Sequence, residues 1–330
     1  MTFKKVFVTL VFVLFLVAVS VHATVQHLAN QYADEMVTEL IELLENSGIS
    51  ISIGRLTVQP YRREVTARNV VIEMGEQPYS IGLVRLSQIE FNEAEDFILA
   101  MRVDVEQSMV SVTPQLADAI HPEVIWQTLQ HMGIEDGQIA QRQSVDYRYI
   151  PELSRVQITA NSRVHHPDNI RQAMYEFEVT TEFSQLPDLQ QMFDDFRRAP
   201  EQSNLSMRWL STGLIAFSAD YIDSGWWSAY RSTAARISGL TEQHFNYASA
   251  EQVTAWIAEL TFLPASTKQL LTQVSADFIT AETPRLHFSV RALPSDGVNI
   301  PMAFMAALMS PNTLENFFKV DLSVDSRENE

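Results

Sequence analysis

An alternation of apolar residues that repeatedly changes phase constrains the fold more than any other feature of this chain. Between residues 49 and 112 every second residue tends to be apolar, but the pattern changes phase at four places. The first change separates two alternating sets: Ile49, Ile51 and Ile53, then Leu56 and Val58. A period of two predicts strands with one buried face, and each change of phase predicts a β-bulge or a bend. Gly54 lies within the first change, where a bulge forms most easily.

Short turn-like segments at residues 60–63, 75–78 and 92–96 link these strands, which predicts an antiparallel meander. Apolar periodicity predicts further strands at residues 144–149, 155–164, 174–183, 205–221 (two strands), 284–291 and 318–324. Helices are predicted at residues 115–132, 187–198, 223–239, 249–260 and 267–278. We therefore expect an α+β fold with an N-terminal membrane helix and a bent antiparallel β-sheet meander with interspersed helices.

The N-terminus predicts attachment to a membrane or export across one. Lys4 and Lys5 precede an apolar run at residues 6–21, and the next charged residue is Asp34. A retained anchor needs roughly 17–25 apolar residues, whereas a cleaved signal peptide has an apolar core of about 7–15 residues. The length of the run falls between these two ranges. We favour the retained anchor, and the alternative is a signal peptide that is cut after Ala23. The two lysines before the run predict a cytoplasmic N-terminus and a body on the far side of the membrane.

Four segments follow from these patterns. Residues 1–23 are the signal anchor or signal peptide, and residues 24–47 predict an amphipathic helix with one apolar stripe and an acidic opposite face. Residues 48–198 form a β-rich region. Residues 199–330 form an α+β region, which belongs either to the same domain or to a second one.

Composition excludes several classes of function. The chain has no cysteine, so it has no disulfide and no thiolate metal site. An exported body without disulfides must be stabilised by its hydrophobic core. The formal net charge of −18 argues against electrostatic binding to nucleic acid or to an anionic membrane surface.

The sequence has no motif with a known catalytic mechanism. It lacks a nucleophile elbow, a zinc-binding H-E-x-x-H helix, a phosphate loop and a dinucleotide fingerprint. His165, His166 and Asp168 offer metal-ligating groups, but adjacent strand residues point to opposite faces, so we interpret them as a polar turn. His121 and His131 are ten residues apart on a predicted helix, a spacing that does not favour a shared metal ion.

Asp220, Asp223 and the pair Trp226–Trp227 form the densest cluster of unusual residues. Two carboxylates beside aromatic rings are typical of sugar-cleaving sites. We favour a structural interpretation, in which Asp223 caps a helix and the tryptophans are core or interface residues.

Two clusters of similar side chains have both a structural and a functional interpretation. The first is basic: Arg55, Arg62, Arg63 and Arg68. It suits lipid headgroups or an acidic partner, or equally a solvated edge that discourages strand aggregation. The second is apolar: Met302, Phe304, Met305, Leu308 and Met309. Such side chains adapt to apolar ligands, but we expect this cluster to belong to the core.

The N-terminal third resembles a known family. A basic start, an apolar anchor and an amphipathic helix precede GISISIGRLTVQPYRREVTARNVVIE, and this arrangement over residues 1–75 is similar to that of AsmA-like bacterial envelope proteins. The resemblance implies an inner-membrane-anchored periplasmic protein whose sheet forms a groove for lipid, in a family linked to lipid transport and outer-membrane integrity. Residues 221–324 are similar to uncharacterised envelope proteins. The resemblance assigns no functional residues.

We therefore expect a non-enzymatic, single-pass inner-membrane protein with a periplasmic body, which handles lipid or another apolar ligand in a β-groove for envelope maintenance. The alternatives are a non-catalytic scaffold of an envelope complex and a periplasmic hydrolase. We predict no catalytic residues, no cofactor and no metal site. The expected partners are the inner membrane, a lipid or apolar ligand and an envelope protein, but no nucleic acid.

Overall fold

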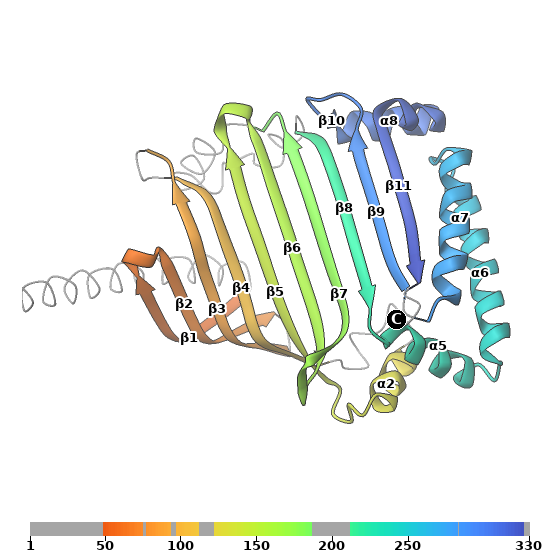
Figure 1. Cartoon of the computed structure of the whole chain (residues 1–330), viewed down its shortest axis with the longest axis horizontal. Coiled ribbons are helices and arrows are strands. Elements are labelled where there is room, and N and C mark those ends of the chain that lie inside the picture. Colours follow the sequence, from red (N-terminus) through yellow and green to blue (C-terminus); the bar gives the residue numbers. More distant parts are fainter. Residues whose placement is uncertain are drawn as a thin grey trace, which may run out of the picture. The chain divides into compact units, whose positions relative to one another are not determined.

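The computed structural model describes residues 49–74, 77–93, 97–111, 122–186, 212–282 and 284–326 (Figure 1). These residues form large antiparallel β-sheet structure with several helices, which confirms the mixed α and β class. They divide into two compact units. The first consists of the described residues up to Ile89 together with Arg102–Ser108. The second consists of Glu90–Met101 and the chain from Met109 onward. The predicted N-terminal anchor (1–23) and amphipathic helix (24–47) lie outside the described residues. So does the predicted helix at 187–198.

The first unit is a meander of consecutive antiparallel strands. Strand β1 (Ile49–Gln59) is joined to β2 (Glu64–Met74) by the one-turn helix η1 (Pro60–Arg62), and β2 pairs in turn with β3 (Gln77–Phe91). The middle of β4 (Ile98–Ser111) completes this unit. The expected turn at residues 60–63 is therefore confirmed, with Arg63 in the left-handed region at φ 50°.

A backbone distortion explains the first change of phase. The register places Gly54 opposite Asn69 and Asn69 opposite Gly82, although none of the three makes a regular pair. Asn69 has a φ of 52°, and a Cβ added to Gly54 would lie 3.0 Å from the Asn69 Cβ. The register is the same on both sides of this line, so no extra residue is inserted. The expected bulge is instead a paired distortion, and the apolar alternation in the sequence of both strands changes phase across it.

The second unit contains the remaining strands: β5 (Gln138–Ile150), β6 (Arg155–His166), β7 (Asn169–Ser184), β8 (Gly213–Asp223), β9 (Pro284–Ala292), β10 (Val298–Asn299) and β11 (Phe318–Ser326). Its sheet has the order β5-β6-β7-β8-β9-β11, with all neighbours antiparallel and β10 beside β8. The helix η2 (Pro151–Leu153) joins β5 to β6. The predicted strands are confirmed here, except for the part of 205–221 that precedes residue 212, which lies outside the described residues.

The helices of the second unit are α2 (Pro122–His131), α5 (Trp226–Ile237), α6 (Glu242–Glu259), α7 (Ala265–Thr280), α8 (Ile300–Met309) and α9 (Leu314–Phe317), with the turn η5 (Pro311–Thr313) between the last two. The predicted start of a helix at residue 249 is wrong, because α6 begins seven residues earlier. Thr241 is its N-cap and accepts a hydrogen bond from the His244 backbone nitrogen at 3.3 Å. Ser249 and Gln252 lie inside the helix, where their spacing no longer marks a start.

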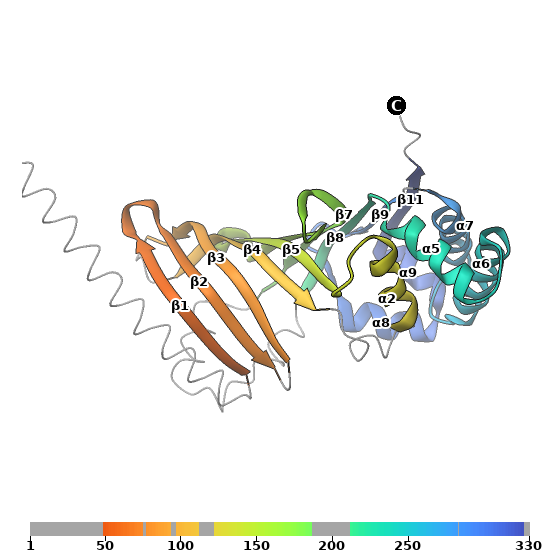
Figure 2. The same cartoon turned by 90° about the horizontal axis from the view of Figure 1, so that it is seen from below.

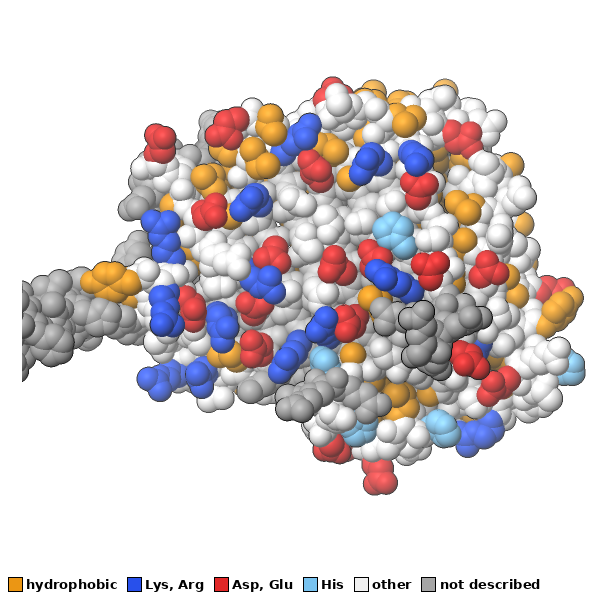
Figure 3. All heavy atoms as spheres, viewed as in Figure 1, with side chains coloured by type: hydrophobic (Ala, Val, Ile, Leu, Met, Phe, Trp, Pro, Cys, Tyr) orange, Lys and Arg blue, Asp and Glu red, His pale blue; other side chains and the backbone are white. Residues whose placement is uncertain are grey.

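The sheet of the second unit has two chemically different faces. On β7, Tyr175, Phe177 and Val179 alternate with Glu176, Glu178 and Thr180. The face that carries the glutamates displays interspersed basic and acidic side chains (Figure 3). Helices α2, α8 and α9 lie on the opposite side of these strands (Figure 2). There, Leu129 of α2 packs with Val164 and Met174. Within the described part of the chain, no helix combines the length and the apolar character needed to span a membrane.

Candidate functional site

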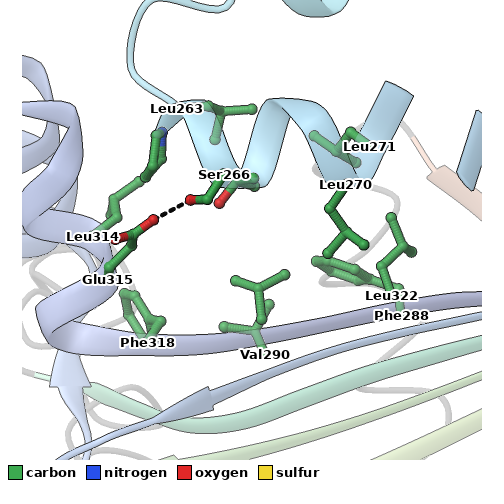
Figure 4. A pocket seen from close by; sticks show the side chains of 13 residues that line it. Leu263, Ser266, Leu270, Leu271, Phe288, Val290, Leu314, Glu315, Phe318 and Leu322 are labelled. Carbon is green, nitrogen blue, oxygen red and sulfur yellow. Dashed lines mark hydrogen bonds between the residues drawn. The ribbon is translucent and has the colours of Figure 1, made fainter. Parts of the chain in front are cut away.

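An apolar pocket lies between the first half of α7 and the strands β9 and β11 (Figure 4). Its volume is about 500 Å³. This volume falls within the range of roughly 300–1,000 Å³ that is usual for small-molecule sites. Three segments that are distant in sequence line it, so the pocket forms only when the second unit folds.

The floor of the pocket consists of cross-strand pairs of apolar side chains. Val290 of β9 is paired with Val320 of β11, and Phe288 is paired with Leu322. Residues that pair directly across two strands project to the same face of the sheet, so all four side chains point toward α7. Phe288 also contacts Phe217 of β8, with 5.8 Å between ring centroids. The apolar floor therefore continues onto the next strand.

The roof of the pocket is one stripe of α7. Thr267, Leu270 and Leu271 line the pocket, and Val274 continues the same stripe at helical spacing and is buried. Leu263 and Pro264 line the end of the pocket just before the helix begins. The pocket is therefore confined to the N-terminal half of α7.

Aromatic contacts fix the C-terminal half of the same helix. Phe278 of α7 lies 4.9 Å from the ring centroid of Trp227 on α5 and 5.9 Å from that of Tyr221 on β8. Such contacts stabilise beyond the area that they bury. The C-terminal half of α7 is thus held against α5 and the sheet, whereas the N-terminal half encloses the pocket.

Asp223 supports this arrangement by capping α5. Its two carboxylate oxygens accept hydrogen bonds from the backbone nitrogens of Gly225 (2.8 Å) and Trp227 (2.9 Å), and one also accepts from the Tyr221 hydroxyl (2.9 Å). The N-cap residue of α5 is Gly225, with a φ of 114°, and not Asp223. Asp223 lies two residues before the N-cap and caps the helix from that position. Burial raises the pKa of Asp223 above its ordinary value, although these hydrogen bonds and the charge of Arg231 act in the opposite direction.

The polar groups of the pocket are few. The Ser266 hydroxyl donates a hydrogen bond to Oε1 of Glu315, which joins the start of α7 to α9 across one side of the pocket (Figure 4). Both residues are solvent-exposed. None of the lining side chains is basic. The site therefore suits an apolar group whose polar end carries no negative charge, because Glu315 would repel an anion.

The structure separates the two aspartates that resembled a sugar-cleaving pair. Asp220 lies on the polar face of the sheet, where Oδ1 is 3.0 Å from Nδ1 of His287 and 4.0 Å from Nη2 of Arg285. Asp223 is the last residue of β8 and is buried on the other face, just before α5 begins. Trp226 packs with the core around Leu129, as the structural interpretation expects.

The histidines do not form a metal site among the described residues. His165 is buried at the end of β6, whereas His166 accepts a hydrogen bond at Nδ1 from the Asp168 backbone nitrogen at 3.2 Å. This is the polar turn expected before Asn169. His131 is exposed at the end of α2, and His121 lies outside the described residues. No group of three His, Asp or Glu side chains lies close enough to hold a metal ion in the part of the chain that the structure describes.

The basic cluster is exposed on the first hairpin. Arg55 of β1 and Arg68 of β2 are a direct cross-strand pair of like charges, and both lie next to the distortion at Asn69. Arg62 and Arg63 lie at the tip of the hairpin. An exposed strand edge and a headgroup-binding surface both need basic side chains at these positions.

The expectation that the methionine-rich cluster belongs to the core is wrong. Met302, Met305, Leu308 and Met309 of α8 are exposed, with 87% of Met309 accessible to solvent. Proline at position 301 favours the start of a helix, and Asn299 caps it by accepting from the Met302 backbone nitrogen at 3.0 Å. The segment therefore forms a short surface helix.

Sequence reasoning missed the pocket, although it predicted its parts. The predicted helix at 267–278 and the strands at 284–291 and 318–324 contain most of the lining residues. No signal in the sequence indicated that these three segments would meet with a space between them. The chain matches no known protein-family model, and no curated protein matches its sequence.

Proposed function

We propose that this chain is a non-enzymatic protein anchored in the bacterial inner membrane, whose periplasmic body holds a lipid or another apolar ligand for envelope maintenance. The observation that carries the proposal is the pocket between α7 and strands β9 and β11, with its apolar floor and roof. The ligand thus lies under one helix, at the end of the sheet, rather than in a groove along the whole meander.

The chemistry of the walls narrows the ligand class. Phe288, Val290 and Leu270 offer dispersion contacts and no directional partner, which suits an acyl or isoprenoid chain. The charged group among the lining residues is the Glu315 carboxylate, and none of these residues carries a positive charge that could pair with a phosphate. A phospholipid would therefore keep its headgroup in solvent, and a neutral lipid would fit with its polar end near Ser266.

The resemblance to AsmA-like envelope proteins supports the same proposal from the other end of the chain. Its strand–turn–strand pattern covers residues 48–73, and the structure has a hairpin with a charged tip at that place. The predicted anchor at residues 6–21 keeps the body close to a source of lipid.

Photo-crosslinking tests the location of the ligand. A diacylglycerol that carries a diazirine on one acyl chain is incorporated into vesicles with the full-length protein and activated by light. We expect adducts on peptides from α7 (Ala265–Thr280) and β9 (Pro284–Ala292). Adducts confined to the N-terminal segment, where any membrane protein meets lipid, would contradict a lipid site in the pocket.

A scaffold role is the second candidate, and one observation favours it. Helix α6 exposes two large aromatic side chains, Tyr247 at 71% and Trp256 at 60%. Exposed aromatic residues are typical anchors of protein interfaces. A stable partner that is lost in Trp256→Ala, together with an empty pocket, would favour the scaffold over the lipid-binding protein.

A further inference from the structure

Helix α8 (Ile300–Met309) is the most exposed apolar element among the described residues. Ile300, Met302, Met305, Leu308 and Met309 expose between 45% and 87% of their surface. We call these five residues the α8 patch. Contiguous exposed apolar surface marks a site of contact with a protein or a membrane.

The three methionines of the α8 patch lie on one side of the helix, and another side is fixed to the body. Ala303 is 2% exposed and packs with Ala292, Val298, Phe317 and Phe318. Met302, Met305 and Met309 follow one another at spacings of three and four residues, so they share the outer face. The helix therefore presents a fixed apolar ridge, and its side chains are mostly flexible thioethers that adapt to irregular partners.

Charge distribution distinguishes a bilayer from other partners. Residues 297–314 contain no charged side chain, and only residues 6–33, around the predicted anchor, form a longer charge-free run in this chain of net charge −18. An acidic surface is repelled by anionic headgroups, so a membrane contact is favourable only where the chain carries no negative charge. The two longest charge-free runs are thus the segments best suited to lipid.

We infer that α8 docks on the same bilayer that holds the N-terminal anchor, with the α8 patch inserted into the interface between headgroups and acyl chains. Interfacial helices bury their apolar face by about 5–10 Å in this way. The inference rests on the membrane attachment in the proposed function, but it does not require a lipid in the pocket. The anchor makes the contact intramolecular, so the short helix needs little affinity of its own.

Docking of α8 would bring the pocket wall to the membrane surface. Phe318 lines the pocket and packs with Ala303 of α8, and Leu314 and Glu315 line it immediately after the η5 turn. The same few residues therefore support the membrane-facing helix on one side and the cavity on the other.

Site-specific quenching tests this inference in the full-length chain. Since the chain has no cysteine, Met305→Cys provides a single site for an environment-sensitive fluorophore, and Tyr247→Cys on the exposed face of α6 provides the control. Each protein is reconstituted into vesicles of phosphatidylethanolamine and phosphatidylglycerol that carry acyl-chain nitroxide lipids in both leaflets. We expect the label at position 305 to be quenched several-fold more than the label at position 247.

A charge variant links the quenching to the α8 patch. Met302→Glu together with Met309→Glu, in the Met305→Cys background, should abolish most of the quenching at position 305. Both side chains are exposed, so the melting temperature should stay unchanged. Because residues 297–314 carry no basic side chain, quenching should also persist in high salt and when phosphatidylcholine replaces phosphatidylglycerol.

Three results would overturn the inference. The first is protein that floats with the vesicles but shows equally weak quenching at positions 305 and 247. This result would mean that the anchor holds the protein on the membrane but that α8 does not contact the bilayer. The second is a label at position 305 that reports a more apolar environment as the protein density in the vesicles rises, but is not quenched by the nitroxide lipids. This result would assign the α8 patch to contact with a second copy of the chain. The third is quenching that disappears in salt, which assigns the membrane contact to charged residues elsewhere.

Discussion

Nη1 of Arg231 on α5 donates a hydrogen bond to the backbone carbonyl oxygen of Ile279 in the last turn of α7, at a distance of 2.6 Å. The last carbonyl groups of a helix have no partner within the helix, and a cation there also interacts favourably with the helix dipole. Arg231 is 5% exposed, so this contact is shielded from water. It fixes the helix that roofs the pocket to its neighbour.

Replacing Arg231 by alanine should therefore destabilise the second unit. The change leaves the buried Ile279 carbonyl without its donor, which costs about 1–3 kcal/mol, in addition to lost packing. Denaturant unfolding measures the difference. The matched control is Arg236→Ala on the same helix, whose exposed hydrogen bond to Gln127 should contribute less than about 0.5 kcal/mol. Equal effects of the two substitutions would show that the buried contact contributes no more than the exposed one.

Asp223→Ala should cost about 1–3 kcal/mol, because it removes the acceptor of two partly buried backbone N–H groups. Asp223→Asn should cost less, since its Oδ1 still accepts from Trp227 and Tyr221. It should not be neutral, because the amide nitrogen would face the N–H of Gly225. Asp220→Asn on the polar face serves as the control, with an expected effect below about 1 kcal/mol. A neutral Asp223→Ala in thermal unfolding would refute the capping role.

The raised pKa of Asp223 gives a pH dependence with a definite sign. The folded protein binds this proton more tightly than the unfolded chain, whose value is near 3.8, so the group contributes most stability at low pH and loses it as pH rises. The stability advantage of the wild type over Asp223→Asn should therefore shrink as the pH rises above about 4. Unfolding of both proteins across this range provides the measurement, and an advantage that grows with pH would mean that the pKa is lowered.

The distortion of the first hairpin predicts coupling between Gly54 and Asn69. Gly54→Ala should destabilise the hairpin by about 1–3 kcal/mol, because its Cβ would lie 3.0 Å from the Asn69 Cβ. In the Asn69→Gly background that atom is gone, and glycine also tolerates the φ of 52°. A double-mutant cycle should therefore show that Gly54→Ala costs less there. Strictly additive free energies would contradict the close approach.

The fold was predictable where local periodicity is strong. Alternating apolar residues indicated the strands, and the phase change at Gly54 indicated a distorted backbone. Asn69, the residue that adopts the left-handed conformation, was not identified, since its role depends on the glycines facing it in the two neighbouring strands. The core assignment of Met302 and Met305 failed because hydrophobicity alone does not separate a buried helix from an exposed one. The pocket depends on how α7 packs at its far end through Phe278 and Arg231, which no local pattern encodes.

Native mass spectrometry of the full-length protein, extracted in mild detergent, shows whether the pocket holds a lipid. Three proteins are compared: the wild type, Val290→Phe, which places a ring in the cavity, and Leu153→Phe, an exposed control on η2. We predict that the wild type and Leu153→Phe carry a bound apolar species that Val290→Phe has lost while keeping the wild-type circular dichroism spectrum. A wild-type protein without bound lipid, or an equal amount of ligand on Val290→Phe, would refute a lipid site in the pocket.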